Sequence, residues 1–108
     1  MEDTNLIYIT VSNIDEARKI ARILVEEKLV ACANIINNVT SIYWWEEKLQ
    51  EDQEVSIIAK TVKKLVDTVI KRVKQTHSYQ CPCVVSVKID DGNKDFLKWV
   101  ASSVKLHY

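Results

Sequence analysis

The chain has 108 residues, enough for one domain with its own hydrophobic core. Its 15 basic and 15 acidic residues cancel, and no basic stripe suits a phosphate backbone, so we expect no nucleic-acid partner. No apolar run approaches the roughly 20 residues of a membrane span, and the first five residues are acidic rather than apolar, so we expect neither a membrane anchor nor export. Three cysteines, an odd number, argue against a disulfide framework and favour the reducing cytoplasm.

The N-terminal part of the chain predicts a strand followed by a helix. Residues 5–11 are almost continuously apolar, which is typical of a strand inside a sheet. Ser12 or Asn13 can cap the next helix, because Glu16 stands where the capping-box partner of Asn13 belongs. Apolar residues then recur at helical spacing, and we expect this helix to end near Lys28.

The middle of the chain predicts two strands joined by a polar turn. Residues 30–36 look extended, and Asn37-Asn38 predicts a bend or bulge, because Asn tolerates a positive φ. The aromatic strand 39–45 follows, then a charged turn over residues 46–54. We expect residues 54–61 to form the partner strand, with three apolar residues on one face: Val55, Ile57 and Ala59.

Large aromatic side chains occupy both faces of the strand 39–45. Tyr43 and Trp45 fall on one face and Trp44 on the other. A strand with one wet face alternates apolar with polar residues, so we expect both faces to be covered, one by the chain's own core and one by a second copy of the chain. We therefore predict that the hairpin projects to a neighbouring subunit and that Tyr43, Trp44, Trp45 and Leu49 form the interface. The alternative is that one of these aromatics is simply exposed.

The C-terminal part completes the predicted topology. Residues 63–75 predict a helix, residues 84–89 a strand, and residues 91–93 a turn. A last helix should place one apolar side inward: Phe96, Leu97, Val100, Ala101 and Val104. The order β-α-β-β-α-β plus a C-terminal helix predicts an α+β, ferredoxin-like split βαβ fold for one domain spanning residues 1–108. Two helices would cover one face of a four-stranded antiparallel sheet and leave the other bare.

The signatures of common enzyme sites are missing from the sequence. Its single glycine, Gly92, rules out a glycine-rich phosphate loop. The sequence has no G-x-S-x-G elbow, and no pair of carboxylates stands out as a general acid and base. We therefore expect a protein without catalysis.

One group of neighbouring residues could bind a metal ion: His77, Cys81 and Cys83. Imidazole and thiolate suit copper or zinc, and the spacing H-x3-C-x-C could bring two or three donors together in a loop. The alternative is that these cysteines are small buried hydrophobes and that His77 is hydrogen-bonded or exposed. A redox pair is a third interpretation, although neighbouring extended residues fit disulfide geometry poorly. Cys32, inside an apolar strand, is interpreted as a packing residue.

Four blocks of the sequence resemble the CutA family of divalent-cation tolerance proteins. Residues 31–35 resemble that family's A-C-x-N-I strand, and residues 39–46 its V-T-S-I-Y-x-W-E run. The pair Lys60-Thr61 resembles the K-T that closes its hairpin, and His77-x-Tyr79-x-x-Pro82 resembles H-P-Y-x-x-P. The spacing between the blocks fits as well, so the resemblance covers nearly the whole chain.

The resemblance implies a ferredoxin-like fold, a tight homotrimer, binding of divalent metal ions (copper especially) and a role in metal tolerance. The chain departs from the family at several positions, with Glu47 for Gly, Asn37-Asn38 for Pro-Gly, Ser78 for Pro and Cys83 for Glu, and Ile9 stands where some members have a copper-linked cysteine. Cys81 and Cys83 can substitute as donors, which would favour softer ions such as Cu(I). We therefore predict a cytoplasmic homotrimer whose metal ligands are His77, Cys81 and Cys83.

A second hypothesis is a trimeric sensor of a small ligand, supported by the resemblance to trimeric signalling proteins of the same fold. Clefts between subunits are natural ligand sites. Trp45, Lys60 and Tyr79 would line such a cleft, and Lys60 would attract an anion.

Overall fold

A computed structural model describes residues 2–105 of the chain. In chain order it contains β1 (Thr4–Val11), α1 (Ile14–Glu26), β2 (Cys32–Trp45), β3 (Lys48–Val62), the 3₁₀ turn η1 (Lys63–Leu65), α2 (Val66–Thr76), β4 (Val84–Lys88) and α3 (Lys94–Ser102). The helices among these residues lack the length and hydropathy that crossing a bilayer requires.

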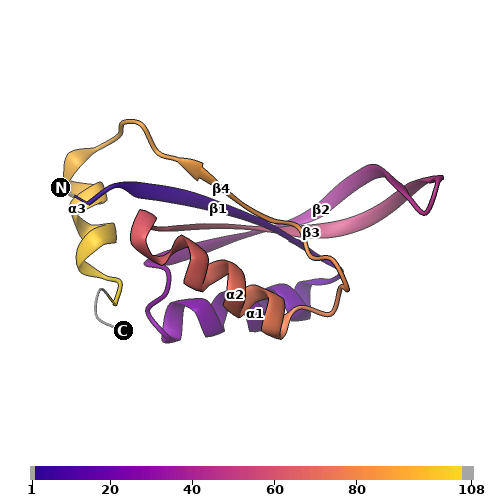
Figure 1. Cartoon of the computed structure of the whole chain (residues 1–108), viewed down its shortest axis with the longest axis horizontal. Coiled ribbons are helices and arrows are strands. Elements are labelled where there is room, and N and C mark those ends of the chain that lie inside the picture. The colour runs from indigo at the N-terminus through magenta and orange to yellow at the C-terminus, as the bar shows by residue number, and fades with distance from the viewer. Residues whose placement is uncertain (1, 106–108) are drawn as a thin grey trace.

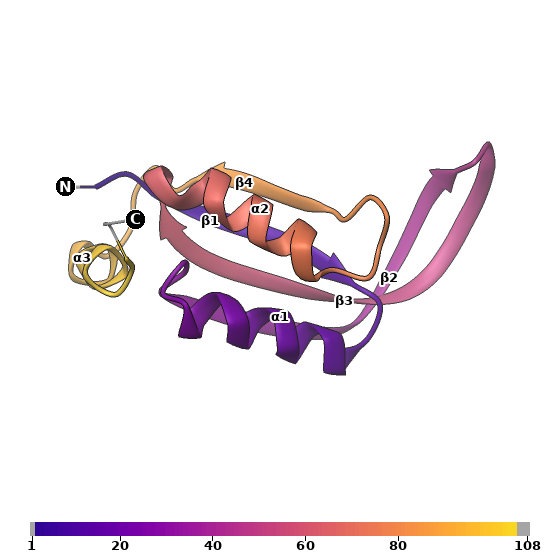
Figure 2. The same cartoon turned by 60° about the horizontal axis from the view of Figure 1, so that its bottom comes forward.

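The four strands form one antiparallel sheet in the order β2-β3-β1-β4. Helices α1 and α2 both lie on one face of this sheet, and α3 lies at the end where the chain begins (Figures 1 and 2). This arrangement confirms the predicted α+β, ferredoxin-like split βαβ fold with its added C-terminal helix.

The core lies between the sheet and the two helices. The β1 residues Ile7 and Ile9 and the β3 residue Ile57 are fully buried there. Asn13 caps α1 as predicted, because its side-chain oxygen accepts a hydrogen bond from the backbone N–H of Glu16 at 2.8 Å. The helix then turns its apolar stripe to the core: Ala17, Ile20, Ala21 and Leu24.

A smaller buried cluster ties α3 to the sheet. Val62 and Leu65 pack there with Val104, which follows α3. Leu97 and Val100 are buried as predicted, but the expectation for Phe96 is wrong, because it is 41% exposed. Neighbouring residues of a helix point about 100° apart, so Phe96 does not share the buried side of α3 with Leu97. Its ring lies near that of Trp99, with the ring centroids 5.6 Å apart.

Strands β2 and β3 continue well beyond the sheet as a two-stranded ribbon, and we call residues 39–54 the arm (Figure 2). The arm begins at a register shift between Ile36 and Val39, where Asn38 has a φ of 61°, which confirms the predicted bulge. The predicted turn over residues 46–54 is wrong, because β3 already begins at Lys48. The turn is only Glu46-Glu47, both with positive φ, as two-residue hairpins require.

Both faces of the arm are exposed within the chain. Tyr43 is 39% exposed, Trp44 72%, and Trp45 46%. The expectation that one face covers the chain's own core is therefore wrong. The strand runs past the end of the layer formed by α1 and α2, and no helix within residues 2–105 covers it (Figure 1). The face of the sheet opposite α1 and α2, which we call the open face, also keeps apolar residues exposed, among them Val85 and Val87.

Candidate functional site

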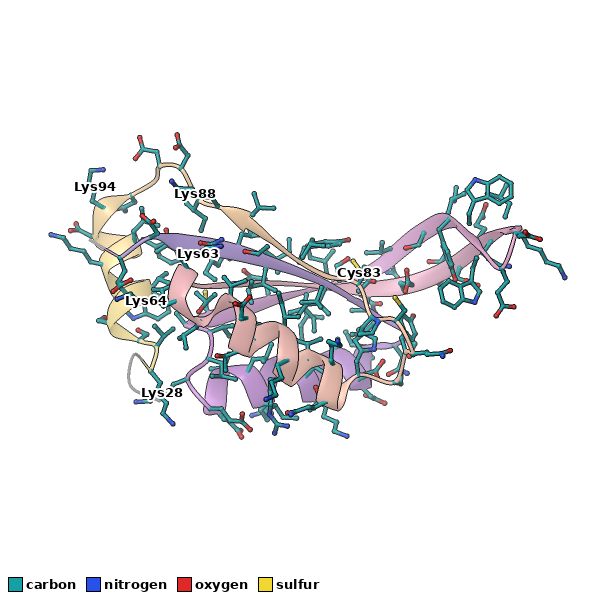
Figure 3. All side chains as sticks on the ribbon, in the orientation of Figure 1. Lys28, Lys63, Lys64, Cys83, Lys88 and Lys94 are labelled. Atoms are coloured by element: carbon teal, nitrogen blue, oxygen red, sulfur yellow. The ribbon has the colours of Figure 1, made fainter. Side chains whose placement is uncertain are left out.

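A cavity of about 590 Å³ lies where the arm leaves the sheet. Three elements meet here: β1, the arm, and the connection between α2 and β4, which we call the 77–83 loop. Figure 3 shows Cys83 at this junction. The lining residues are Tyr8, Thr10, Ser41, Tyr43, Trp45, Glu54, Tyr79, Gln80, Cys81 and Cys83.

Tyr79 links the 77–83 loop to the arm. Its hydroxyl donates a hydrogen bond to Oε2 of Glu54 at 2.7 Å. Burial of the ring raises the pKa of Tyr79, and the bond to Glu54 and the charges of Glu54 and Glu16 raise it further. Tyr79 therefore stays a neutral phenol that donates its proton to Glu54.

His77 fixes the start of the 77–83 loop. Its Nδ1 accepts the backbone N–H of Tyr79 at 3.0 Å, so Nε2 carries the ring hydrogen and donates to the backbone oxygen of Thr10 at 2.7 Å. The ring also lies against that of Tyr79, with centroids 4.6 Å apart. His77 thus has both nitrogens engaged, as the hydrogen-bonded alternative for this residue expects.

Glu16, at the start of α1, holds the next residue of the loop. Its Oε2 accepts the backbone N–H of Ser78 at 2.8 Å, and its Oε1 accepts from Ser12. Partial burial raises the pKa of Glu16, but the hydrogen bonds from Ser78 and Ser12 outweigh it, and the pKa lies below its ordinary value. The carboxylate therefore pins the loop to α1 while it is ionised.

Two further tyrosines are held on the cavity wall. Tyr43 donates its hydroxyl proton to Oδ2 of Asp52 across the arm, and this bond, with burial and the charges of Asp52 and Glu54, raises the pKa of Tyr43. Tyr8 and Ser56 share a hydrogen bond of 2.7 Å between their hydroxyls on neighbouring strands. Rings tied at their hydroxyl ends have few orientations left, so the wall is largely pre-formed.

The structure brings some of the expected metal ligands together. Cys81 and Cys83 are both exposed and both line the cavity. Cys32 is half-buried on β2. Across residues 2–105, no three histidine, cysteine or carboxylate side chains are grouped as a metal-binding set. At the cavity, one chain thus offers two soft donors, the thiols of Cys81 and Cys83.

Of the three residues expected to line a ligand cleft, the structure brings two to the cavity. Trp45 and Tyr79 do share the cavity, but Lys60 does not line it and instead donates a hydrogen bond to Oδ1 of Asn34. Sequence reasoning missed Tyr8 and Glu54, which the strand register carries to the cavity from separate parts of the sheet. A signal was available for Tyr8 only, as the one polar-tipped aromatic within a continuous apolar strand.

The chain is thus an α+β protein with a ferredoxin-like sheet, a projecting aromatic arm, and a cavity where that arm leaves the sheet. The family model described as "CutA1 divalent ion tolerance protein" matches residues 5–103. The chain belongs to this family.

Known members of the family match this chain over nearly its whole length. The divalent-cation tolerance protein CutA of Archaeoglobus fulgidus is 41% identical over 101 residues, which are 94% of this chain and 98% of that protein. The chloroplastic protein CutA 1 of Oryza sativa is 38% identical over 93% of this chain, which spans just over half (56%) of that longer protein. The crystal structure of CutA1 from Oryza sativa has a TM-score of 0.95 at 36% identity and covers 98% of this chain and 97% of its own.

Proposed function

We propose that the chain is a non-catalytic, cytoplasmic divalent-cation tolerance protein that works as a homotrimer and binds copper or another metal ion through Cys81 and Cys83. Its relatives carry the name of tolerance proteins. The observation that supports the binding site is the pair of exposed thiols in one cavity. Three unpaired cysteines also suit a reducing compartment.

The donor chemistry favours a soft ion. Thiolates select Cu(I) and similar ions, whereas Mg²⁺ and Ca²⁺ require several oxygens. Two thiols from one chain do not complete a closed zinc site, which requires four ligands. His77 can serve as a further ligand only by giving up its bond to Thr10 or to Tyr79. The thiol pair is therefore the primary site, and additional donors come from elsewhere.

The proposed trimer rests on surfaces that one chain leaves uncovered. On the face of the arm that carries Trp44, Ile42 and Leu49 are each 63% exposed. On the open face of the sheet, Val85 is 50% and Val87 56% exposed. Contiguous exposed apolar residues of this kind mark interaction sites. A second and third copy, each offering the same arm and the same open face, would bury them.

Competition titration with a chromogenic Cu(I) chelator tests the metal site. The variant Cys81→Ser with Cys83→Ser should lose most of the Cu(I) binding of the parent, and Cys32→Ser, the matched control, should lose none. Affinity should rise with pH, because both thiols must lose their protons to bind. A double variant that binds as tightly as the parent would contradict the proposed site.

A small-ligand sensor is the second candidate function. The supporting observation is the cavity itself, since about 590 Å³ lies within the 300–1,000 Å³ typical of small-molecule sites. Trp45 and Tyr79 line it as that hypothesis expects. The expected cation Lys60 is not among the lining residues, so the cavity offers no support for an anionic ligand.

A further inference from the structure

The 77–83 loop, which carries two of the thiols, is held at both of its ends by one residue of β1. At the start of the loop, Nε2 of His77 donates a hydrogen bond to the backbone oxygen of Thr10 at 2.7 Å. At its end, the backbone N–H of Thr10 donates to the backbone oxygen of Cys83 at 3.3 Å. Cys83 also lies directly before β4. The sheet therefore fixes the position of Cys83.

Cys81 has no such anchor of its own. Within residues 2–105, neither Gln80, Cys81 nor Pro82 takes part in a hydrogen bond. Cys81 is also exposed, so packing restrains it little. A site built from two thiols needs both sulfurs close together, and a free loop loses conformational entropy when it binds an ion. The restraint on Cys81 therefore has to come from a neighbouring residue.

Tyr79, two residues before Cys81, is held at its backbone and at its side chain. Its backbone N–H donates to Nδ1 of His77 at 3.0 Å, and its hydroxyl donates to Oε2 of Glu54 at 2.7 Å. Glu54 is itself well fixed, because it is paired across the two strands of the arm and lies next to the buried Val55. The bond to Glu54 thus ties the middle of the loop to the base of the arm.

We infer that Tyr79 is the positioning residue of the proposed metal site: its hydrogen bond to Glu54 holds the Cys81 thiol where it and Cys83 can bind one Cu(I) ion. This inference rests on the metal function proposed above. Tyr79 does not bind the ion itself, because its hydroxyl already bonds a carboxylate and Cu(I) selects sulfur ligands. The bond joins two parts of one chain, so a neighbouring chain that covers the arm leaves it intact and keeps water from it.

Titration of Cu(I) against a chromogenic chelator measures the contribution of Tyr79. Tyr79→Phe removes only the hydroxyl and should lower the affinity for Cu(I) about tenfold, as other groups that orient metal ligands do when removed. Glu54→Gln keeps an acceptor but removes its charge, so its effect should be smaller. In the Tyr79→Phe background, Glu54→Gln should cause no further loss, because Glu54 acts through Tyr79.

Thr40→Val is the control. It removes the 2.9 Å hydrogen bond from Gln53, which joins the two strands of the arm without reaching the loop. This variant should bind Cu(I) as tightly as the parent.

A second measurement uses the metal-free protein and separates positioning from general stability. NMR relaxation of the backbone amides should show lower order parameters at Gln80 and Cys81 in Tyr79→Phe than in the parent. The amides of α2 should be unchanged, and the melting temperature should stay close to that of the parent.

A Tyr79→Phe protein that binds Cu(I) as tightly as the parent, or that keeps the parent's order parameters at Cys81, overturns the inference. A double variant that binds more weakly than Tyr79→Phe alone also overturns it, since Glu54 would then act on the ion directly. Should Tyr79→Phe fail to fold, an affinity in Glu54→Gln equal to that of the parent overturns it instead. A parent that binds no Cu(I) contradicts the proposed function and the inference with it, whereas unchanged binding in the Tyr79 and Glu54 variants leaves the thiol site standing.

Discussion

Trp44→Asp tests whether the arm is an interface. Trp44 is 72% exposed in the single chain, and a tryptophan side chain offers roughly 150–250 Å² for burial. Covering the exposed part removes about 110–180 Å² from water, which stabilises the assembly by about 3–4.5 kcal/mol for each copy at about 25 cal/mol per Å². Aspartate loses this term and also brings an unpaired charge into the contact.

The isolated chain and the trimer respond differently to this change. On an exposed surface the substitution shifts the free energy of unfolding by only about 0.5 kcal/mol. In a buried contact a loss of 3 kcal/mol weakens association more than about 100-fold. The variant should therefore dissociate at concentrations where the parent stays assembled.

Light scattering after size exclusion, over a range of protein concentrations, measures the effect. The parent should have three times the 12.5 kDa mass of the chain, and Trp44→Asp should approach the mass of one chain on dilution. Trp44→Phe, which keeps an apolar ring, should remain a trimer. A parent that runs as a monomer, or an aspartate variant with the parent's mass at every concentration, would refute the reasoning.

Three further predictions concern the core, the turn and the loop. Ile9→Ala should lower the free energy of unfolding by about 2–5 kcal/mol in urea denaturation, because Ile9 is fully buried, and a loss below 1 kcal/mol would contradict the core assignment. Glu47→Gly should raise it by about 0.5–1 kcal/mol, since Glu47 has a φ of 64° and glycine adopts this conformation without strain. An unchanged midpoint would count against strain there. Glu16 has a lowered folded pKa, so its contribution is present above the ordinary value of 4.5 and is lost as pH falls through the folded pKa. Glu16→Gln should weaken the fall in the free energy of unfolding at acid pH. If this free energy falls equally with pH in parent and variant, the hydrogen bond from Ser78 to Glu16 does not stabilise the fold.

The fold could be predicted from the sequence where local signals agreed with the tertiary structure. Residues within the segment itself predicted the strand β1, the Asn13 cap and the Asn37-Asn38 bulge, and the structure contains all three. The predicted turn was too long because the residues after Glu47 are mostly polar or acidic, and such a stretch is typical of a turn. In the structure they form half of a ribbon whose two faces lie outside the core, so strand pairing there does not require alternation.

The candidate site could be predicted only in part, for a topological reason. The 77–83 loop is local, and its histidine, tyrosine and cysteines stand out together in the sequence. Glu54 and Tyr8 come from elements far away in the chain, and only the register of β1 and β3 brings them to the cavity. Lys60 shows the reverse case: it lies on β3 as expected, but Asn34 on the neighbouring strand holds its side chain.

X-ray absorption at the copper edge tests the proposed metal site most directly. The parent protein, loaded with one Cu(I) per chain under reducing conditions, should show sulfur in the first coordination shell. Cys81→Ser with Cys83→Ser should lose those sulfur neighbours, and Cys32→Ser should keep them. A first shell of nitrogen and oxygen alone in the parent would contradict the proposal that Cys81 and Cys83 bind the ion.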